Sequence, residues 1–327
     1  MTWNRRDILV GMAACAASTL LSRHAFAQGG YPARPVRVVV PYAAGGGTDF
    51  FARLVFAEIG NRLGQQFVIE NKAGAGTNLG GEAVARAEPD GYTLLLGDTA
   101  TYATNRTLYS KLAFDPYKDF SPVSLSGRFA LVLLVNTDKL KAGSVRELIA
   151  AAKQNSGGVT YGTPGLGSPF HLATELLAQS AGIKLTHVPY RGAAPAVQDL
   201  VAGNIQMMFI DFATARSQLS GPIRAIAVAS PGPFAGLPGI PSVAADFPGF
   251  EAWAWQGIVA PAGTPPEIIT TLNEAYRRAV GQPEIREKLA GAGIEVLQST
   301  PEEMAAYMRS EGEKWEKVIR TANIKLE

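Results

Sequence analysis

Three glycine-rich segments carry the groups best suited to hold a ligand. They are residues 41–49 (PYAAGGGTD), 71–81 (NKAGAGTNLGG) and 161–171 (YGTPGLGSPFH). Glycine lets the backbone approach a ligand closely, and the unpaired N–H groups at a helix N-terminus favour a bound anion. Any one of these segments is equally well explained as a tight turn. Three of them, spread over two putative domains, predict an anion site at an interdomain cleft.

Three charged side chains near these segments each have two interpretations. Asp49 either stabilises the start of a helix or pairs with a cationic group of the ligand. Arg191, next to Tyr190 in residues 187–192 (HVPYRG), either binds a carboxylate with two hydrogen bonds or forms a surface or hinge salt bridge. Asp211 follows an apolar run and either accepts a ligand ammonium or hydroxyl or caps a turn. The sequence leaves all three open.

A hydrolase is an alternative use of the third segment. Its serine does not fit the G-x-S-x-G nucleophile motif, because residues 165–169 read GLGSP. The only histidines beyond residue 27 are His171 and His187. Ser168 and His171 would share one helix start, so Ser168 is better interpreted as the cap of that helix. This alternative is therefore weak.

A nucleotide-binding enzyme is a second alternative. Gly74, Gly76 and Gly80 are spaced one residue wider than the dinucleotide fingerprint, and Asp98 would have to bind the ribose. The segment follows the second predicted strand rather than the first, which argues against this function. Two histidines without a cysteine make a zinc site improbable, and a calcium-loop motif is absent from the sequence. We expect no cofactor and no metal.

The hydrophobic pattern places these segments between strands and helices. The predicted strands are residues 36–40, 67–70, 92–96, 129–135, 159–162, 185–188, 207–210, 223–229 and 257–260. Helices are predicted after most of them, and their start signals include Thr48, Ser144 with Glu147, Thr264, and Thr300 with Glu303. Repeated strand–loop–helix units predict an α/β fold with mostly parallel sheets covered by helices on both faces. In such sheets the ligand lies at the carboxyl ends of the strands.

The first 27 residues have the pattern of a secretory signal peptide. Arg5 and Arg6 precede an apolar stretch, residues 8–21, and Ala25-Phe26-Ala27 is a small-x-small cleavage site. The two arginines fit the twin-arginine route and the ordinary Sec route equally well. The single cysteine, Cys15, lies inside this segment, where lipidation is an alternative fate. We therefore expect a periplasmic protein whose mature form has no thiol.

Composition agrees with a globular exported protein. The chain has 327 residues, 47% of them hydrophobic and 18% charged. Without residues 1–27, basic and acidic residues are equal in number, so neither nucleic acid nor a polybasic membrane anchor is indicated. An aromatic cluster near the C-terminal part of the chain is better interpreted as core packing and a hinge anchor, where the chain would return to the first of two domains, than as a partner interface; it comprises Phe250, Trp253 and Trp255.

The order of the motifs resembles one protein family. The segments PYAAGGGTDFFAR (41–53), ENKAGAGTNLGG (70–81), DGYTLLLG (90–97), YGTPGLGSPFHLATE (161–175), HVPYRGAAPAVQDLVAGNIQ (187–206) and WQGIVAPAGTPPEII (255–269) occur in this order. Together they resemble the tripartite tricarboxylate transporter receptors, the Bug or TctC-like periplasmic binding proteins. The resemblance covers essentially all of the chain after residue 27.

That resemblance implies a two-domain Venus-flytrap fold. Domain 1 would comprise residues 28–127 plus 251–327, and domain 2 residues 128–250. The lobes would close by hinge motion near residues 121–128 and 250–256. The implied function is capture of a small carboxylate, such as a dicarboxylate, an aromatic acid or an amino acid, without catalysis. The implied partner is a membrane permease of large and small subunits, with a sensing or scavenging role as a variant, and we expect a monomer.

The resemblance also implies the site, in which backbone amides and water hold the ligand carboxylate. In domain 1 the implied residues are Tyr42, Ala43, Gly45, Gly46, Gly76, Thr77 and Asn78. In domain 2 they are Thr163, Gly165, Gly167, Ser168, Tyr190 and Asp211. Contacts to the far end of the ligand vary in this family, so the resemblance does not identify the ligand.

Overall fold

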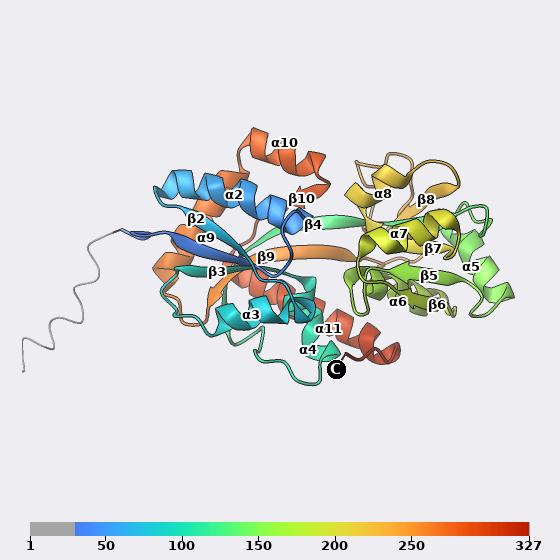
Figure 1. Cartoon of the computed structure of the whole chain (residues 1–327), viewed down its shortest axis with the longest axis horizontal. Helices are drawn as coiled ribbons and strands as arrows, with labels where there is room; N and C mark the ends of the chain where they lie inside the picture. The colour runs from blue at the N-terminus through green and yellow to red at the C-terminus, as the bar shows by residue number, and fades with distance from the viewer. Residues whose placement is uncertain (1–29, 327) are drawn as a thin grey trace, which may run out of the picture.

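Two lobes lie side by side in the computed structural model, which describes residues 30–326 (Figure 1). The predicted signal peptide, including Cys15, lies outside the described residues. No helix between residues 30 and 326 is both long and apolar enough to cross a membrane.

The first lobe is built on a sheet of strand order β2-β1-β3-β9-β4, with β10 on the far edge of β4. The strands are β1 (Val36–Val40), β2 (Phe67–Asn71), β3 (Thr93–Asp98), β4 (Phe120–Asn136), β9 (Trp253–Pro261) and β10 (Ile294–Val296). Strand β1 pairs in parallel with β2 and β3, whereas β9 runs antiparallel to both of its neighbours. The carboxyl ends of β1, β2 and β3 therefore lie at one edge of the lobe.

Helices cover both faces of this sheet. Helices α2 (Gly47–Leu63), α9 (Pro266–Val280) and α10 (Pro283–Gly291) pack with the strands in one apolar cluster. The other face carries α3 (Asn78–Ala85), α4 (Asn105–Leu108) and α11 (Pro301–Thr321), with short turns η1 (Ala75–Thr77) and η2 (Ala100–Thr104).

The second lobe repeats this design with the strands β8, β4, β7, β5 and β6. Its strands are the end of β4, β5 (Thr160–Thr163), β6 (Thr186–Pro189), β7 (Met207–Asp211) and β8 (Ile223–Val228). Helices α5 (Val145–Gln154) and α6 (Pro169–Ala181) cover one face, and α7 (Ala193–Ala202) and α8 (Phe212–Gln218) cover the other. A short turn, η3 (Val243–Ala245), precedes the return to the first lobe. The predicted α/β class is confirmed in both lobes. The sheets are mixed: β1 pairs in parallel with β2 and β3, and β5 with β6 and β7, whereas all pairs made by β4 and β9 along their lengths are antiparallel.

Two extended segments connect the lobes. Strand β4 pairs with β9 up to Ala130 and with β7 from Leu131 onward, so one strand belongs to both sheets. The chain returns after β8, where the Ala252 amide donates to the Ala229 carbonyl at 3.0 Å before β9 begins. The predicted domain boundaries near residues 127 and 251 stay predictions.

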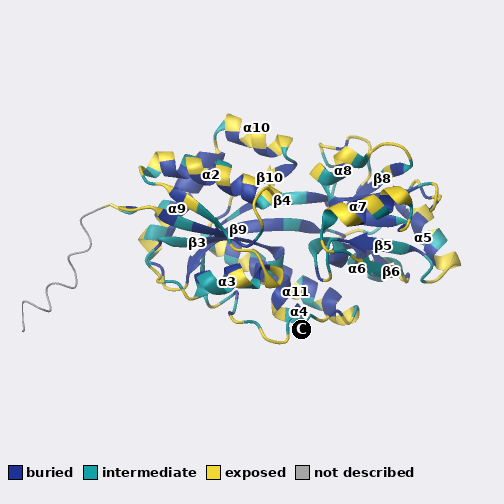
Figure 2. Cartoon of the chain, in the orientation of Figure 1, coloured by how far each residue is buried: buried dark blue, intermediate teal, exposed yellow. Residues whose placement is uncertain are grey.

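Apolar residues at regular spacing explain the packing. All of β1 except Arg37 is buried, as expected for a β-branched run between helix layers. Phe250, Trp253 and Trp255 are buried, which confirms that they pack in the core rather than form an exposed surface. Figure 2 shows β9 mostly in the colour of buried residues. The largest apolar cluster extends through both lobes, where α11 packs against α6.

Helix starts differ slightly from the sequence-based expectation. Thr300 and Glu303 form the predicted capping box, and Ser144 accepts a hydrogen bond from the Glu147 amide. Thr48 does not cap α2, because this helix begins two residues earlier with Gly46 as its N-cap. Thr264 donates to the Pro261 carbonyl instead, and Pro265 is the N-cap of α9.

Candidate functional site

The three glycine-rich segments meet where the lobes face each other. We call residues 41–46 loop 1, residues 72–77 loop 2 and residues 164–168 loop 3. Loops 1 and 2 adjoin, because the Asn71 side chain donates to the Tyr42 carbonyl at 3.0 Å. Loop 3 reaches the first lobe at Gly167, where an added Cβ would lie 2.7 Å from Leu108 of α4. Since α4 also contacts loop 2 through Asn105, all three loops lie around one junction.

Loop 1 presents unpaired amides at the start of α2. The Phe50 amide donates to the Gly46 carbonyl, which is the first hydrogen bond of the helix. Within residues 30–326 the amides of Gly46, Gly47 and Thr48 have no acceptor, and both glycines are exposed. These N–H groups and the positive end of a 17-residue helix favour an anion here.

Asp49 holds loop 1 in place. Its carboxylate accepts hydrogen bonds from Arg53 Nε at 3.0 Å, from Asn71 at 2.9 Å and from the Gly45 amide at 2.9 Å. The hydrogen bond from Arg53 is the main reason that the pKa of Asp49 falls to about 2. Asp49 is thus paired with a cation of its own helix, which supports the helix-start interpretation. The Gly45 amide is occupied as well.

Loop 2 has an unusual backbone. Ala75, Gly76 and Thr77 all have positive φ, at 46°, 58° and 82°. Such conformations cost a non-glycine residue about 1–3 kcal/mol and persist only where the surroundings enforce them. A Cβ on Gly76 would lie 2.5 Å from the Tyr109 hydroxyl, so only glycine fits there.

Asn105 enforces this conformation. Its side-chain amide donates to the Gly76 carbonyl and to Asn78 Oδ1, each at 2.6 Å, and lies 3.3 Å from Thr77 Oγ1. Thr77 is buried and also accepts from the Thr101 hydroxyl at 2.9 Å. The side chains of Thr77 and Asn78 therefore turn inward, and the exposed part of loop 2 is the backbone of residues 74–76.

Asp98 connects loop 1 to the end of β3. Tyr42 donates its hydroxyl to Asp98, whose other oxygen accepts from the Ala100 amide at 3.1 Å and from the Thr101 amide at 3.2 Å. Burial raises the pKa of Asp98 and of the Tyr42 hydroxyl. Asp98 is buried and fully engaged within the protein, which argues against a ribose-binding role.

Loop 3 is held by two histidines. The Gly167 amide donates to His171 Nδ1 at 3.0 Å, and Thr163 Oγ1 lies 2.7 Å from His187 Nε2. The two imidazole rings stack with their centroids 4.0 Å apart. Burial lowers the pKa of His171 to about 3 and that of His187 to about 4, so both rings are neutral at pH 7.

Ser168 caps α6, as the sequence predicts. Its hydroxyl accepts from the His171 amide at 3.3 Å, while the His171 ring accepts from Gly167. The serine hydroxyl is therefore not paired with the ring that a hydrolase would use as its base.

The remaining second-lobe residues have defined partners. Tyr190 donates its hydroxyl to Asp199 at 2.6 Å. Asp211 caps α8 by accepting from the Thr214 amide at 2.9 Å and from the Thr214 hydroxyl at 2.8 Å. Arg191 is exposed and has no ion pair within the described part of the chain. The capping interpretation of Asp211 is thus supported, and Arg191 stays available to an anion.

The predicted site residues divide into two groups. Three of them, Ala43, Gly46 and Gly76, expose their backbone. Seven others use their side-chain polar groups in hydrogen bonds inside the protein: Tyr42, Thr77, Asn78, Thr163, Ser168, Tyr190 and Asp211. The amides of Gly45 and Gly167 are also bonded inside the protein. Gly165 is half-buried, and its carbonyl accepts from Thr163. Sequence reasoning missed Asn71, Arg53 and Asn105, which hold the loops. The sequence offers no local signal for Asn105, because Gly76 and Asn78 lie 29 and 27 residues away along the chain.

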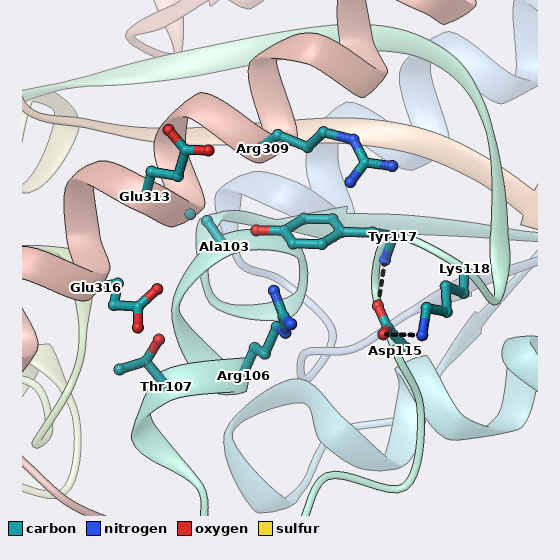
Figure 3. A pocket seen from close by; sticks show the side chains of 10 residues that line it. Ala103, Arg106, Thr107, Asp115, Tyr117, Lys118, Arg309, Glu313 and Glu316 are labelled. Atoms are coloured by element: carbon teal, nitrogen blue, oxygen red, sulfur yellow. Dashed lines mark hydrogen bonds and ion pairs between the residues drawn. The ribbon is translucent and has the colours of Figure 1, made fainter.

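A partly open pocket lies apart from these loops. It has a volume of about 260 Å³ and lies between α4, residues 115–118 and α11 (Figure 3). Arg106 and Arg309 each place a guanidinium 5.1 Å from the ring centroid of Tyr117. None of the predicted site residues lines this pocket. Nowhere in residues 30–326 are three His, Asp or Glu side chains grouped as metal ligands would be.

The chain is similar to receptor proteins over most of its length. Residues 51–324 match the model of the family described as tripartite tricarboxylate transporter family receptor. The "UPF0065 protein in tcbD-tcbE intergenic region" of Pseudomonas sp. strain P51 is 38% identical over 96% of this chain and 94% of its own length. Protein BugT of Bordetella pertussis is 36% identical over 90% of this chain and 91% of its own length.

Solved structures show the same fold. Rpa4515 of R. palustris with adipate is 37% identical, with a TM-score of 0.80 over 90% of this chain and 99% of the other. MatC of Rhodopseudomonas palustris with bound malate is 34% identical, with a TM-score of 0.75 over 88% of this chain and 100% of the other. The predicted resemblance and the predicted binding-protein fold are thereby confirmed.

Proposed function

The chain belongs to the tripartite tricarboxylate transporter receptor family, and from that premise we propose that it captures a small carboxylate between its lobes. The family consists of periplasmic receptors, so the site of action is the periplasm. Adipate and malate, bound by two similar proteins, are the kind of ligand we expect.

The observation that carries this proposal is the set of unpaired amides at the start of α2. Gly46, Gly47 and Thr48 are free to donate, and Asp49 beside them is already paired with Arg53. A carboxylate oxygen at this helix end accepts charge-assisted hydrogen bonds without displacing any bond of the protein.

The proposed roles of the site residues follow from their contacts. The backbone of loop 1 and loop 2 holds the carboxylate, through Ala43, Gly46 and Gly76. Loop 3 closes over it from the second lobe, with Gly165 and Ser168 at its edge. The other predicted residues position these loops through the hydrogen bonds described above. Arg191, which is exposed and has no ion pair within the described residues, is the cation that we assign to a second acidic group of the ligand.

The wider role is transport or sensing without chemical change of the ligand. The expected partner is a membrane permease of large and small subunits, and the expected state is a monomer of two domains, residues 28–127 plus 251–327 and residues 128–250. Residues 1–27 would direct export by the twin-arginine or the Sec route.

Calorimetry and thermal unfolding with adipate, malate, glutamate and benzoate test the proposal. We expect saturable stabilisation by at least one acid, because a ligand that binds only the folded state adds about 2.7 kcal/mol at a hundred times its Kd. NMR of the incubated ligand should show no product. Absence of binding by every acid, or turnover of one, would contradict the proposal.

A pair of substitutions at one position tests the amide itself. Gly46 has no atom within 4 Å of an added Cβ, so alanine has room there, and its φ of −81° lies at the edge of the range that proline adopts. Gly46→Pro removes the N–H, whereas Gly46→Ala keeps it. A hydrogen bond to a charged group contributes about 1.5–3 kcal/mol, so we expect Kd to rise roughly tenfold to a hundredfold in G46P alone. Equal affinities of the two variants would show that this amide does not touch the ligand.

A further inference from the structure

A contact between the lobes lies across the crossover strands from the glycine-rich loops. In β4, Phe129 faces the start of α2, because an added Cβ on Gly47 would lie 2.9 Å from its ring. The adjacent Arg128 faces the other way, since neighbours along a strand alternate. There Arg128 lies 3.8 Å from the ring centroid of Trp253 and pairs with Glu295 at 2.7 Å. We call this side the rear of the hinge.

The rear of the hinge contains a groove of about 450 Å³ between the lobes. Arg128 and Trp253 form its floor, and residues 230–236 line it from the second lobe. The ion pair between Arg128 and Glu295 attaches β10 to β4, so the residues before β10 move with the first lobe.

Phe212 and Gly293 bring the lobes into contact in this groove. Phe212 begins α8 of the second lobe, and Gly293 directly precedes β10 of the first; both are buried. A Cβ on Gly293 would lie 2.9 Å from Phe212 Cδ1 and 3.5 Å from the Ala213 amide nitrogen. The absence of a side chain at residue 293 therefore decides how closely the lobes approach here.

This contact opposes opening of the ligand site. The start of α2, next to loop 1, lies on the Phe129 side of β4, whereas Phe212 and Gly293 line the groove on the Arg128 side. A rotation about these strands that brings the loops together separates Phe212 from Gly293, and the reverse rotation presses them together. Closely packed groups resist such compression steeply. Contact at the rear thus limits how far the loops can separate.

We infer that the contact between Phe212 and Gly293 is the steric stop that sets the resting angle of the lobes, and hence the affinity for the carboxylate. The inference rests on the proposed function, since it assumes that the ligand binds the closed form. A larger residue at position 293 shifts the resting angle toward closure. More of the unliganded molecules are then in the binding-competent state. The observed affinity rises, because the apparent Kd is the intrinsic Kd divided by the binding-competent fraction.

Gly293→Asn tests this inference. Asparagine tolerates the left-handed backbone of Gly293, whose φ is 75°. We expect the unliganded variant to have a smaller radius of gyration in X-ray scattering and to bind adipate about threefold to tenfold more tightly. The matched control is Gly182→Asn, at a left-handed helix end with no atom within 4 Å of an added Cβ, and it should change neither quantity.

Phe212→Leu provides the reverse test. A smaller side chain lets the rear close further, so the unliganded protein should have a larger radius of gyration and bind adipate more weakly. The double variant F212L/G293N should return toward the wild type in both measurements. If G293N matches G182N in scattering and affinity, the inference is wrong. If adipate does not bind the wild type, the scattering comparison still decides the inference, and the proposed function is judged separately on the panel of acids.

Discussion

Replacement of Asn105 by alanine should lower both the free energy of unfolding and the affinity for the ligand. Asn105 is almost fully buried and makes two hydrogen bonds of 2.6 Å, to the Gly76 carbonyl and to Asn78 Oδ1. At about 0.5–1.5 kcal/mol each, their loss should reduce the free energy of unfolding by about 1–3 kcal/mol. In a chain of this size that corresponds to several degrees in Tm.

The effect on affinity follows from the backbone of loop 2. Without Asn105, the positive φ angles of Ala75 and Thr77 are no longer enforced, and each costs about 1–3 kcal/mol to hold. Loop 2 should therefore relax, and restoring its conformation on binding should raise Kd by about tenfold or more. Calorimetric titration with the acid that binds the wild type measures this directly.

Asn273 offers a matched control. It is also a buried asparagine of the first lobe, and its amide donates to the Val123 carbonyl at 2.7 Å and to the Ser299 carbonyl at 2.8 Å, away from the three loops. Asn273→Ala should lose similar stability and retain the wild-type Kd. If N105A also retains the wild-type Kd while losing stability, the conformation of loop 2 has no part in binding and our reasoning about this loop fails.

Three further predictions follow from the site. The pKa of Asp49 is lowered to about 2, so the stability that its carboxylate contributes is present above the unfolded-state pKa of about 3.9 and is lost as the pH falls toward 2. Urea unfolding should show D49N less stable than wild type at pH 7. This difference should shrink below pH 4. The pKa values of His171 and His187 lie below the unfolded-state value of about 6.5, so the unfolded chain takes up more protons than the folded protein as the pH drops. The free energy of unfolding should therefore be fully retained above pH 6.5 and decline below it. NMR should show both rings still neutral at pH 5.5. Gly167 has φ 74°, and an added Cβ there would lie 2.7 Å from Leu108, whereas an added Cβ at Gly165 meets open space. Thermal unfolding should show a lower Tm for G167A than for G165A. Equal Tm values would refute a close approach of loop 3 to α4.

The sequence predicts the glycine-rich segments better than the hydrogen bonds that hold them. Periodicity and glycine placement identify β1, loop 1 and the capping box of Thr300, because these depend on neighbouring residues. The start of α2 was placed two residues late, since Gly46 caps with its backbone and gives no side-chain signal.

The missed features depend on partners far apart in the chain. Asn105 meets Gly76 across 29 residues, and Tyr42 meets Asp98 across 56. No local pattern encodes these pairs, so Asp98 could still be considered a ribose ligand from the sequence. Asp211 presents a different difficulty: its capping partner Thr214 is only three residues away, but an acid at the end of a strand is equally compatible with ligand contact.

The position of β9 between β3 and β4 bears on the order in which the protein can mature. A nascent chain that has reached residue 250 already contains every strand of the second lobe, but the sheet of the first lobe still lacks a central member. The half of the molecule that is synthesised first is therefore completed last. A premature stop at residue 250 should therefore leave residues 30–119 without a stable structure, because β9 is missing, and it also removes α11, which packs against α6 of the second lobe.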